Sequence, residues 1–252
     1  MNAAFNFPMT LALFPLSTSG GGVVVLPRDD ICRVWCAPTA RRLATMWPKH
    51  SKIPVTRRTV LGIAISRDEG ATWTHQTIAL TQIQNIYIQS TAVDADGNLY
   101  IAWTGPSTLP YLTISRDRGN TWSTPIPLAA PGVQQVRTVA IAARRPGEIA
   151  LAYQGTTDGT NFNGYITSTR DALAKRPIYW SATVNDPAEP LVNGSDSQTF
   201  GDRILYLTNV IGSNGSVWAG FHCAKTAACP GQRLGVMGRL APNPFKEVRS
   251  QN

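Results

Sequence analysis

An eight-residue motif that occurs twice constrains the fold of this chain more than any other feature of the sequence. Ser66-Arg-Asp-Glu-Gly-Ala-Thr-Trp73 returns as Ser115-Arg-Asp-Arg-Gly-Asn-Thr-Trp122, with six of the eight residues identical after 115 − 66 = 49 positions. A degenerate third copy is divided by an insertion into Thr169-Arg-Asp171 and Ile178-Tyr-Trp180. Self-similarity at a fixed period of this length indicates a repeat architecture.

The segments around the motif repeat in the same order. Each unit has an apolar strand, a turn, a second strand, a loop, a third strand, the motif and a fourth strand. The turns are Asp94-Ala-Asp-Gly97, Arg144-Arg-Pro-Gly147 and Gly212-Ser-Asn-Gly215. Four strands in about 50 residues describe one blade of a β-propeller. The sequence therefore predicts an all-β fold with four recognisable four-stranded blades, in a ring that is either partial or irregularly closed.

The residue types in the motif predict a structural staple. An Asp in a tight turn accepts hydrogen bonds from backbone N–H groups, and a Gly two positions later tolerates the left-handed conformation. The Ser adds a hydroxyl to the turn, and the Trp brings a large ring to pack between neighbouring blades. These residues are Ser66, Asp68, Gly70 and Trp73 in the first copy, and Ser115, Asp117, Gly119 and Trp122 in the second.

The two intact copies resemble the Asp-box of the sialidase and BNR-repeat superfamily, and the chain from Val60 to Leu240 resembles the C-terminal blades of secreted bacterial sialidase-like proteins. The resemblance implies a sialidase-type β-propeller, an extracellular location, and a glycan or glycoprotein surface as partner, without cofactor or metal. It begins after residue 58. We therefore expect a poorly defined N-terminal segment (1–58, a decayed blade or a linker), the blades (59–241) and a C-terminal tail (242–252).

Enzymes of this superfamily use an arginine triad for the substrate carboxylate, a Tyr nucleophile with an acidic partner, and an Asp acid/base, all away from the Asp-boxes. Their Arg-Ile-Pro signature is absent upstream of the first box, where the nearest string is Lys52-Ile-Pro54. Lys lacks the planar guanidinium that grips a carboxylate with two hydrogen bonds. We therefore expect an incomplete catalytic site.

Five polar residues stand where inner strands of the blades are expected to begin. Arg137 and Arg203, with Gln89, are candidates for binding an anionic sugar, and Tyr206 and Asp202 are candidates for catalysis. The alternative is that they satisfy loop N–H and C=O groups around the channel, as any propeller requires. We favour this alternative, because catalysis needs a whole constellation and the sequence names no acidic partner for Tyr206.

Cysteines and charge bear on the compartment and the partner. Cys223 and Cys229 enclose a short loop, which favours a disulfide and an oxidising compartment, with two buried or free thiols as the alternative. The net charge is +8, of which residues 1–60 carry +6, so the repeats are nearly neutral and nucleic acid is not expected as a partner. No apolar run is long enough to span a membrane, and Met9–Leu16 is a poor signal peptide.

Three functions are compatible with these observations. The first is a non-catalytic extracellular propeller that binds a glycan or a protein, which intact staples beside an incomplete site favour. The second is an exo-α-sialidase or related glycoside hydrolase, which the resemblance and the Arg and Tyr candidates favour. The third is a truncated product without independent activity, in keeping with fewer blades than the six of a closed sialidase-type ring. The oligomeric state does not follow from the sequence.

Overall fold

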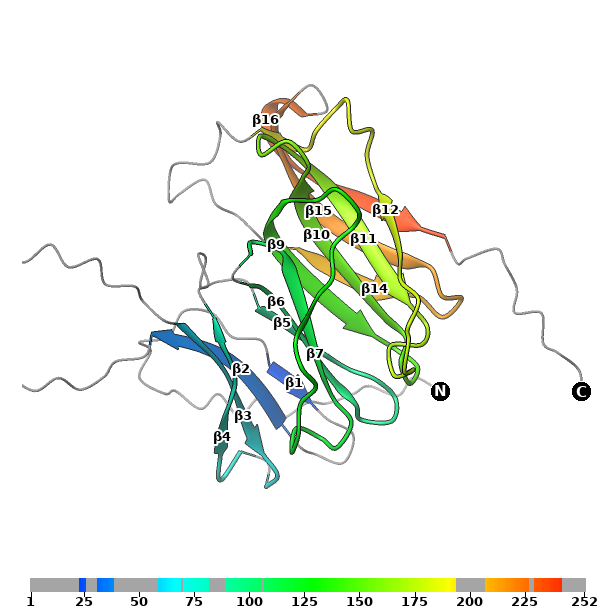
Figure 1. The fold of residues 1–252 in the computed structure, drawn as a ribbon. Coiled ribbons are helices and arrows are strands. Elements are labelled where there is room, and N and C mark those ends of the chain that lie inside the picture. Colours follow the sequence, from blue (N-terminus) through cyan, green and yellow to red (C-terminus); the bar gives the residue numbers. More distant parts are fainter. Residues whose placement is uncertain are drawn as a thin grey trace, which may run out of the picture.

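The computed structural model describes residues 23–25, 31–38, 59–68, 70–81, 89–105, 107–193, 207–226 and 229–241. All regular secondary structure in these ranges is β, as the sequence predicts (Figure 1). The strands form antiparallel meanders, in which each strand pairs with the strand that follows it in the chain.

The first two meanders have four strands each. The first contains β1 (Val23–Val25), β2 (Ile31–Pro38), β3 (Thr59–Ser66) and β4 (Thr74–Thr81). Strands from the N-terminal segment thus belong to this sheet, since Ile31 of β2 lies opposite Ser66 of β3. The second contains β5 (Gln89–Val93), β6 (Leu99–Thr104), β7 (Pro110–Ser115) and β8 (Ile126–Pro127).

The last two meanders are joined into one sheet. The third contains β9 (Gln135–Ala143), β10 (Ile149–Thr156), β11 (Asn161–Thr169) and β12 (Trp180–Thr183). The fourth contains β14 (Thr208–Ile211), β15 (Val217–Thr226) and β16 (Cys229–Leu240). Between them, β13 (Val192–Asn193) pairs with β11 and β15. Three of these meanders have four strands, and the last has three strands in the described ranges.

Hydrophobic packing between meanders forms the core. On β6, Leu99, Ile101 and Trp103 pack against Leu61 and Ile63 of the first meander. The alternate side chains of β6, among them Tyr100, pack against the third meander. A strand side chain points to one face or the other at every second residue, so a fully buried strand such as β6 must have a sheet on both faces. This is the packing of propeller blades.

The first strands of successive meanders lie next to one another. β1 contacts β5, β5 contacts β9, and β9 contacts β14. This arrangement places one strand from every meander along a shared inner line, as in a propeller. The visible meanders fan out from it in Figure 1.

The antiparallel register gives the sheets two different ends. At one end lie the links between the first and second strands and between the third and fourth strands of each meander, which include both copies of the repeated motif. We call this the box end, and the two motif turns the first box turn (Ser66–Trp73) and the second box turn (Ser115–Trp122). At the other end, the loop end, the first strands begin and the second and third strands are connected.

Candidate functional site

Arg137 is the predicted binding residue whose surroundings the structure describes, and a β-bulge sets its position. On β10, Gln154 lies opposite Thr138 of β9, but the next residue, Gly155, lies opposite Val136. Arg137 is therefore the extra residue of the bulge. Bulges bend a strand and redirect a side chain, and they are frequent beside functional sites. Here the bulge lies at the start of β9, at the loop end.

The side chain of Arg137 is held against an aromatic ring. Its guanidinium carbon lies 3.9 Å from the centroid of the Phe162 ring. Phe162 belongs to β11 and is 2% exposed, so the ring is fixed by the core between the third and fourth meanders. A guanidinium stacked on an aromatic face gains cation–π attraction and loses conformational freedom. Arg137 is thus half-buried and preorganised.

Contacts near Arg137 connect the third meander with the fourth. Gln154 is buried and donates a hydrogen bond from Nε2 to the carbonyl oxygen of His222 on β15, at 2.5 Å. The adjacent Cys223 forms a disulfide with Cys229, which closes the link between β15 and β16 at the loop end. These two contacts therefore tie β15 to the third meander and to β16 at the loop end.

The other predicted site residues are placed less fully. Gln89 is the first residue of β5 and lies opposite Trp103. Asp202, Arg203 and Tyr206 lie outside the described residues, so the candidate catalytic pair stays a prediction. Arg137 and Gln89 each stand near the start of the first strand of a meander.

At the box end, the first box turn is a closed set of hydrogen bonds. Asp68 Oδ1 accepts from Ser66 Oγ and from the Thr72 backbone N–H, both at 2.8 Å, and its Oδ2 accepts from Thr72 Oγ1 at 2.5 Å. Ser66 Oγ accepts from the Gly70 N–H at 2.7 Å. The hydrogen bonds from Thr72, followed by that from Ser66, hold the pKa of Asp68 below its ordinary value. Gly70 has a φ of 92°, in the left-handed region that favours glycine.

The second box turn repeats this geometry. Asp117 accepts from Ser115 Oγ (2.8 Å), Thr121 N (2.8 Å) and Thr121 Oγ1 (2.6 Å), and Gly119 N donates to Ser115 Oγ (2.7 Å). Gly119 has a φ of 87°.

The two tryptophans of the motif differ in their contacts. Trp122 packs against the core between the first and second meanders, and its Nε1 donates to Gln76 Oε1 at 3.3 Å. Trp73 Nε1 donates to the Gly70 carbonyl in its own turn, at 3.1 Å. The degenerate third copy keeps part of the geometry, since Asp171 accepts from Thr169 Oγ1 and from the Ile178 N–H.

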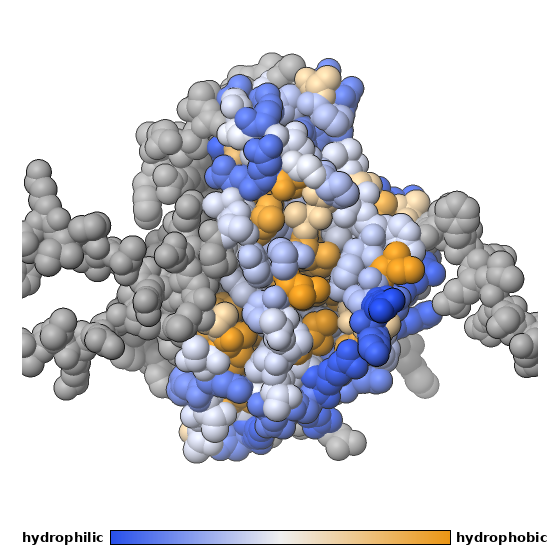
Figure 2. Space-filling view, in the orientation of Figure 1, coloured by the Kyte–Doolittle hydropathy of each residue, from blue (hydrophilic) through white to orange (hydrophobic). Residues whose placement is uncertain are grey.

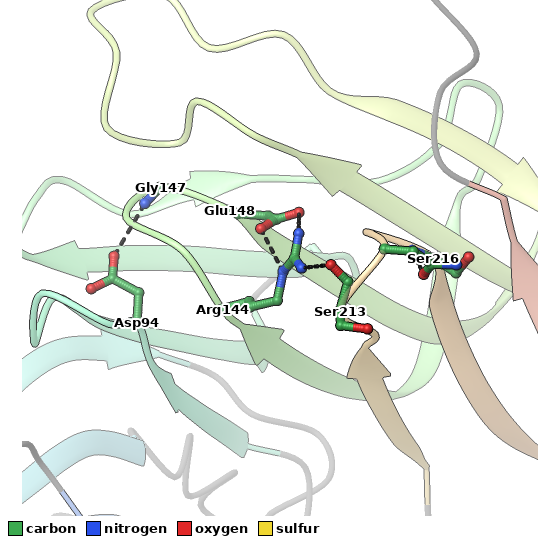
Figure 3. Close-up of polar contacts among 7 residues, drawn as sticks. Asp94, Arg144, Gly147, Glu148, Ser213 and Ser216 are labelled. Carbon is green, nitrogen blue, oxygen red and sulfur yellow. Dashed lines mark hydrogen bonds and ion pairs between the residues drawn. The ribbon is translucent and has the colours of Figure 1, made fainter. Parts of the chain in front are cut away.

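The sequence did not predict a buried carboxylate at the box end. Asp94 follows β5 and is 3% exposed. Its oxygens accept from Asp96 N, Asn98 N and Asn98 Nδ2 in its own turn, from Tyr100 OH, and from the Gly147 N–H of the next meander. Figure 3 shows Asp94 facing Gly147, beside the Arg144–Glu148 pair. The one available signal was the string Asp-x-Asp-Gly-Asn at residues 94–98, which predicts a turn and gives no indication of a contact between blades.

Two features are absent among the described residues, a cluster of metal ligands and a long apolar helix. Among their side chains, no three His, Cys, Asp or Glu residues come together as metal ligands would. Within the same ranges there is no helix of the length and apolarity that a membrane span requires.

Comparison with solved structures identifies the class of fold. A protein of unknown function from Dyadobacter fermentans superposes with a TM-score of 0.57 at 14% identity, over 87% of this chain and 52% of that one. The NanB sialidase of Streptococcus pneumoniae gives 0.53 at 13% identity, over 87% and 30% of the chains. The leech intramolecular trans-sialidase gives 0.51 at 14% identity, over 88% and 31%.

These similarities define a β-propeller of the sialidase type. At such identities they establish the fold alone, and the chain spans between 30% and 52% of the length of these three proteins. No protein-family model and no curated protein sequence matches the chain.

Proposed function

We propose that this chain is an extracellular, sialidase-like β-propeller protein that binds an anionic glycan or a glycoprotein at its loop end, with an incomplete catalytic site. The observation that carries the proposal is the presentation of Arg137, on a bulge at the start of an inner strand and against the buried ring of Phe162. The box end, in contrast, is occupied by turn-closing hydrogen bonds.

The chemistry of a guanidinium suits an acidic sugar. A carboxylate accepts two parallel hydrogen bonds from the edge of the guanidinium plane. Stacking on Phe162 uses the face of that plane, so the two contacts are compatible. Because the ring already orders the side chain, less conformational entropy is lost when an anion binds.

The disulfide supports an extracellular location. Cys223 and Cys229 are both buried and bonded. Structural disulfides persist mainly in oxidising compartments, where proteins meet the glycans of cell surfaces and secretions.

The second candidate function is that of an exo-α-sialidase. Asp202, Arg203 and Tyr206 come shortly before β14, which lies next to β9 and β10: Asn209 Nδ2 donates to the Ala150 carbonyl at 2.7 Å. A Tyr nucleophile and a second Arg at the start of β14 would share the loop end with Arg137. This position in the chain favours the candidate.

Two measurements on the full chain separate these functions. A glycan array, followed by calorimetric titration with sialyllactose, tests binding, and a fluorogenic sialoside tests turnover. We expect binding without turnover. Replacing Arg137 by Ala should weaken binding by about tenfold to a hundredfold, since a hydrogen-bonded charge contributes about 1.5–3 kcal/mol.

A matched control is Arg41→Ala, which removes a guanidinium from the N-terminal segment (1–58) and should leave binding unchanged. Turnover that disappears in Arg203→Ala and Tyr206→Phe would establish the sialidase instead. Equal binding by wild type and Arg137→Ala, or no binding to any acidic glycan, would refute the proposed site.

A further inference from the structure

Charge is divided between the two ends of the described sheets. Among the described side chains, the box end carries nine basic and six acidic residues, and the loop end carries one basic and three acidic residues. Among these side chains, the basic residues are therefore concentrated at the box end. The basic residues of the box end are Arg67, Arg116, Arg118, Arg144, Arg145, Arg170, Lys175, Arg176 and Arg239.

The carboxylates of the box end are largely committed to internal contacts. Asp68 and Asp117 accept hydrogen bonds within the two box turns, and Asp171 accepts one within the degenerate third copy. Asp94 is buried and accepts hydrogen bonds from its own turn. Glu148 forms an ion pair with Arg144 at 2.8 Å. A carboxylate that already accepts several hydrogen bonds presents little of its oxygen surface to an external cation. An approaching anion therefore meets mainly guanidinium and ammonium groups.

Three guanidiniums converge on one glycine turn of the fourth meander. Arg144 donates to the Ser213 carbonyl, as Figure 3 shows, and Arg239 donates to Ser216 Oγ at 3.0 Å. A Cβ placed on Gly215 would lie 3.4 Å from Arg170 Nη2 and 3.6 Å from Arg144 Nη2. These arginines come from three strand ends of two meanders. Glu148 neutralises one of them, so the cluster keeps an excess of about two positive charges.

Five basic residues of the box end are accessible. Arg145, Arg170, Lys175, Arg176 and Arg239 are all exposed. Figure 2 shows strongly hydrophilic residues along the lower edge of the molecule, where the turns of the box end lie in Figure 1. The box end is thus hydrophilic and carries exposed basic side chains.

We propose that the box end is a second binding surface, centred on the Gly212–Ser216 turn, for an acidic polysaccharide that carries sulfate or carboxylate groups. Repeated anionic groups along a polymer match arginines that are spread over successive turns. Nucleic acid is disfavoured, because its binding commonly uses an element that enters a groove or aromatic platforms for bases. The described box end consists of short turns. The disulfide also favours a compartment where acidic polysaccharides are abundant.

A pair of charge-matched variants tests this surface. In one, Arg170, Lys175 and Arg176 are replaced by Gln; in the other, Arg41, Arg42 and Lys49 of the basic N-terminal segment are replaced by Gln. Each variant lowers the net charge from +8 by three units. The probes are heparin, polygalacturonate, neutral dextran and duplex DNA, with affinities measured from about 50 to 200 mM salt, a range over which polyanion binding is strongly salt-dependent.

We expect wild type to bind heparin or polygalacturonate in a salt-dependent manner and to ignore dextran. The box-end variant should bind at least about tenfold more weakly. The slope of log affinity against log salt concentration should be smaller by about two to three, since each contact that is removed means about one counterion fewer released on binding. The N-terminal variant should bind as wild type does. This control separates the surface from the basic segment that precedes the blades.

Three results would overturn the inference. The first is an absence of salt-dependent binding to both acidic polysaccharides. The second is a loss of binding in the N-terminal variant with none in the box-end variant, which would assign the effect to the segment outside the blades. The third is tighter binding to duplex DNA than to either polysaccharide at equal salt, which would identify a nucleic-acid surface.

Discussion

The buried carboxylate of Asp94 offers the sharpest test of how neighbouring blades are held together. Its two oxygens accept six hydrogen bonds, three each. In Asp94→Asn, the side-chain amide turns one of these oxygens into an NH2 group. An NH2 at the Oδ2 position would meet the Asn98 amide, the Tyr100 hydroxyl and the Gly147 N–H, all of them donors in the native structure.

The size of the effect follows from these contacts. Asn98 Nδ2 keeps its hydrogen bond to Oδ1, the Gly147 N–H keeps Tyr100 OH as a second acceptor at 3.1 Å, and the Tyr100 hydroxyl can rotate and accept. The new NH2 group therefore costs about one buried hydrogen bond, and Asp94→Asn should lower the free energy of unfolding by about 1–3 kcal/mol. That is a measurable share of the roughly 5–15 kcal/mol that stabilises a typical domain. Burial and the hydrogen bond to Asp94 raise the pKa of Tyr100 well above its ordinary value, so this hydroxyl stays protonated.

The assay is urea unfolding followed by tryptophan fluorescence and far-UV circular dichroism. Asp96→Asn is the matched control, because it removes the same charge from an exposed position of the same turn. A surface substitution of this kind changes stability by no more than about 0.5 kcal/mol. If Asp94→Asn and Asp96→Asn unfold at the same urea concentration, the interpretation of Asp94 as a link between blades is wrong.

Three further predictions concern the box turns, the disulfide and the sugar site. Partial desolvation raises the pKa of Asp117, but its hydrogen bonds together lower it more. The stability that depends on the ionised Asp117 is therefore present above its unfolded pKa of about 4 and lost as the pH falls further; Asp117→Asn should cost about 1 kcal/mol at neutral pH and less in acid, by urea unfolding. Replacing Cys223 and Cys229 by Ser should cost about 2 kcal/mol for so short a loop, by the same measurement. Phe162→Leu should weaken binding of sialyllactose about three- to tenfold in wild type and much less in Arg137→Ala, because its ring acts through the guanidinium.

The repeated motif allowed the fold class and the box turns to be predicted because their determinants are local. Ser66, Asp68, Gly70 and Thr72 lie within seven residues, and the turn they form closes on itself. The hydrogen bonds of such a motif can therefore be predicted from its residue types and their spacing. The apolar segments beside the turns likewise predicted the strands, since a strand that is buried on both faces has apolar residues at successive positions.

The bulge at Arg137 and the contact of Asp94 with Gly147 could not be predicted, because both depend on how separate strands align. Nothing in the residues around 137 marks an extra residue in the strand, since the bulge is defined only by the pairing of β9 with β10. Asp94 and Gly147 are 53 residues apart and meet only once two meanders pack. The bridging strand β13 was missed for the same reason, as its two residues gain their role from β11 and β15.

Arginine side chains at the box end link each meander to the next. At the box end, arginines of one turn reach the next: Arg67 donates to the Arg118 carbonyl at 3.1 Å, and Arg116 donates to the Leu173 carbonyl at 2.6 Å. Each meander is thus bound to its successor by backbone acceptors, which do not depend on the identity of the accepting side chain. The loop end has its own link between meanders, the hydrogen bond from buried Gln154 Nε2 to the His222 carbonyl. Loss of the box-end arginines should weaken the contacts between successive meanders, because these contacts use an arginine side chain as the donor.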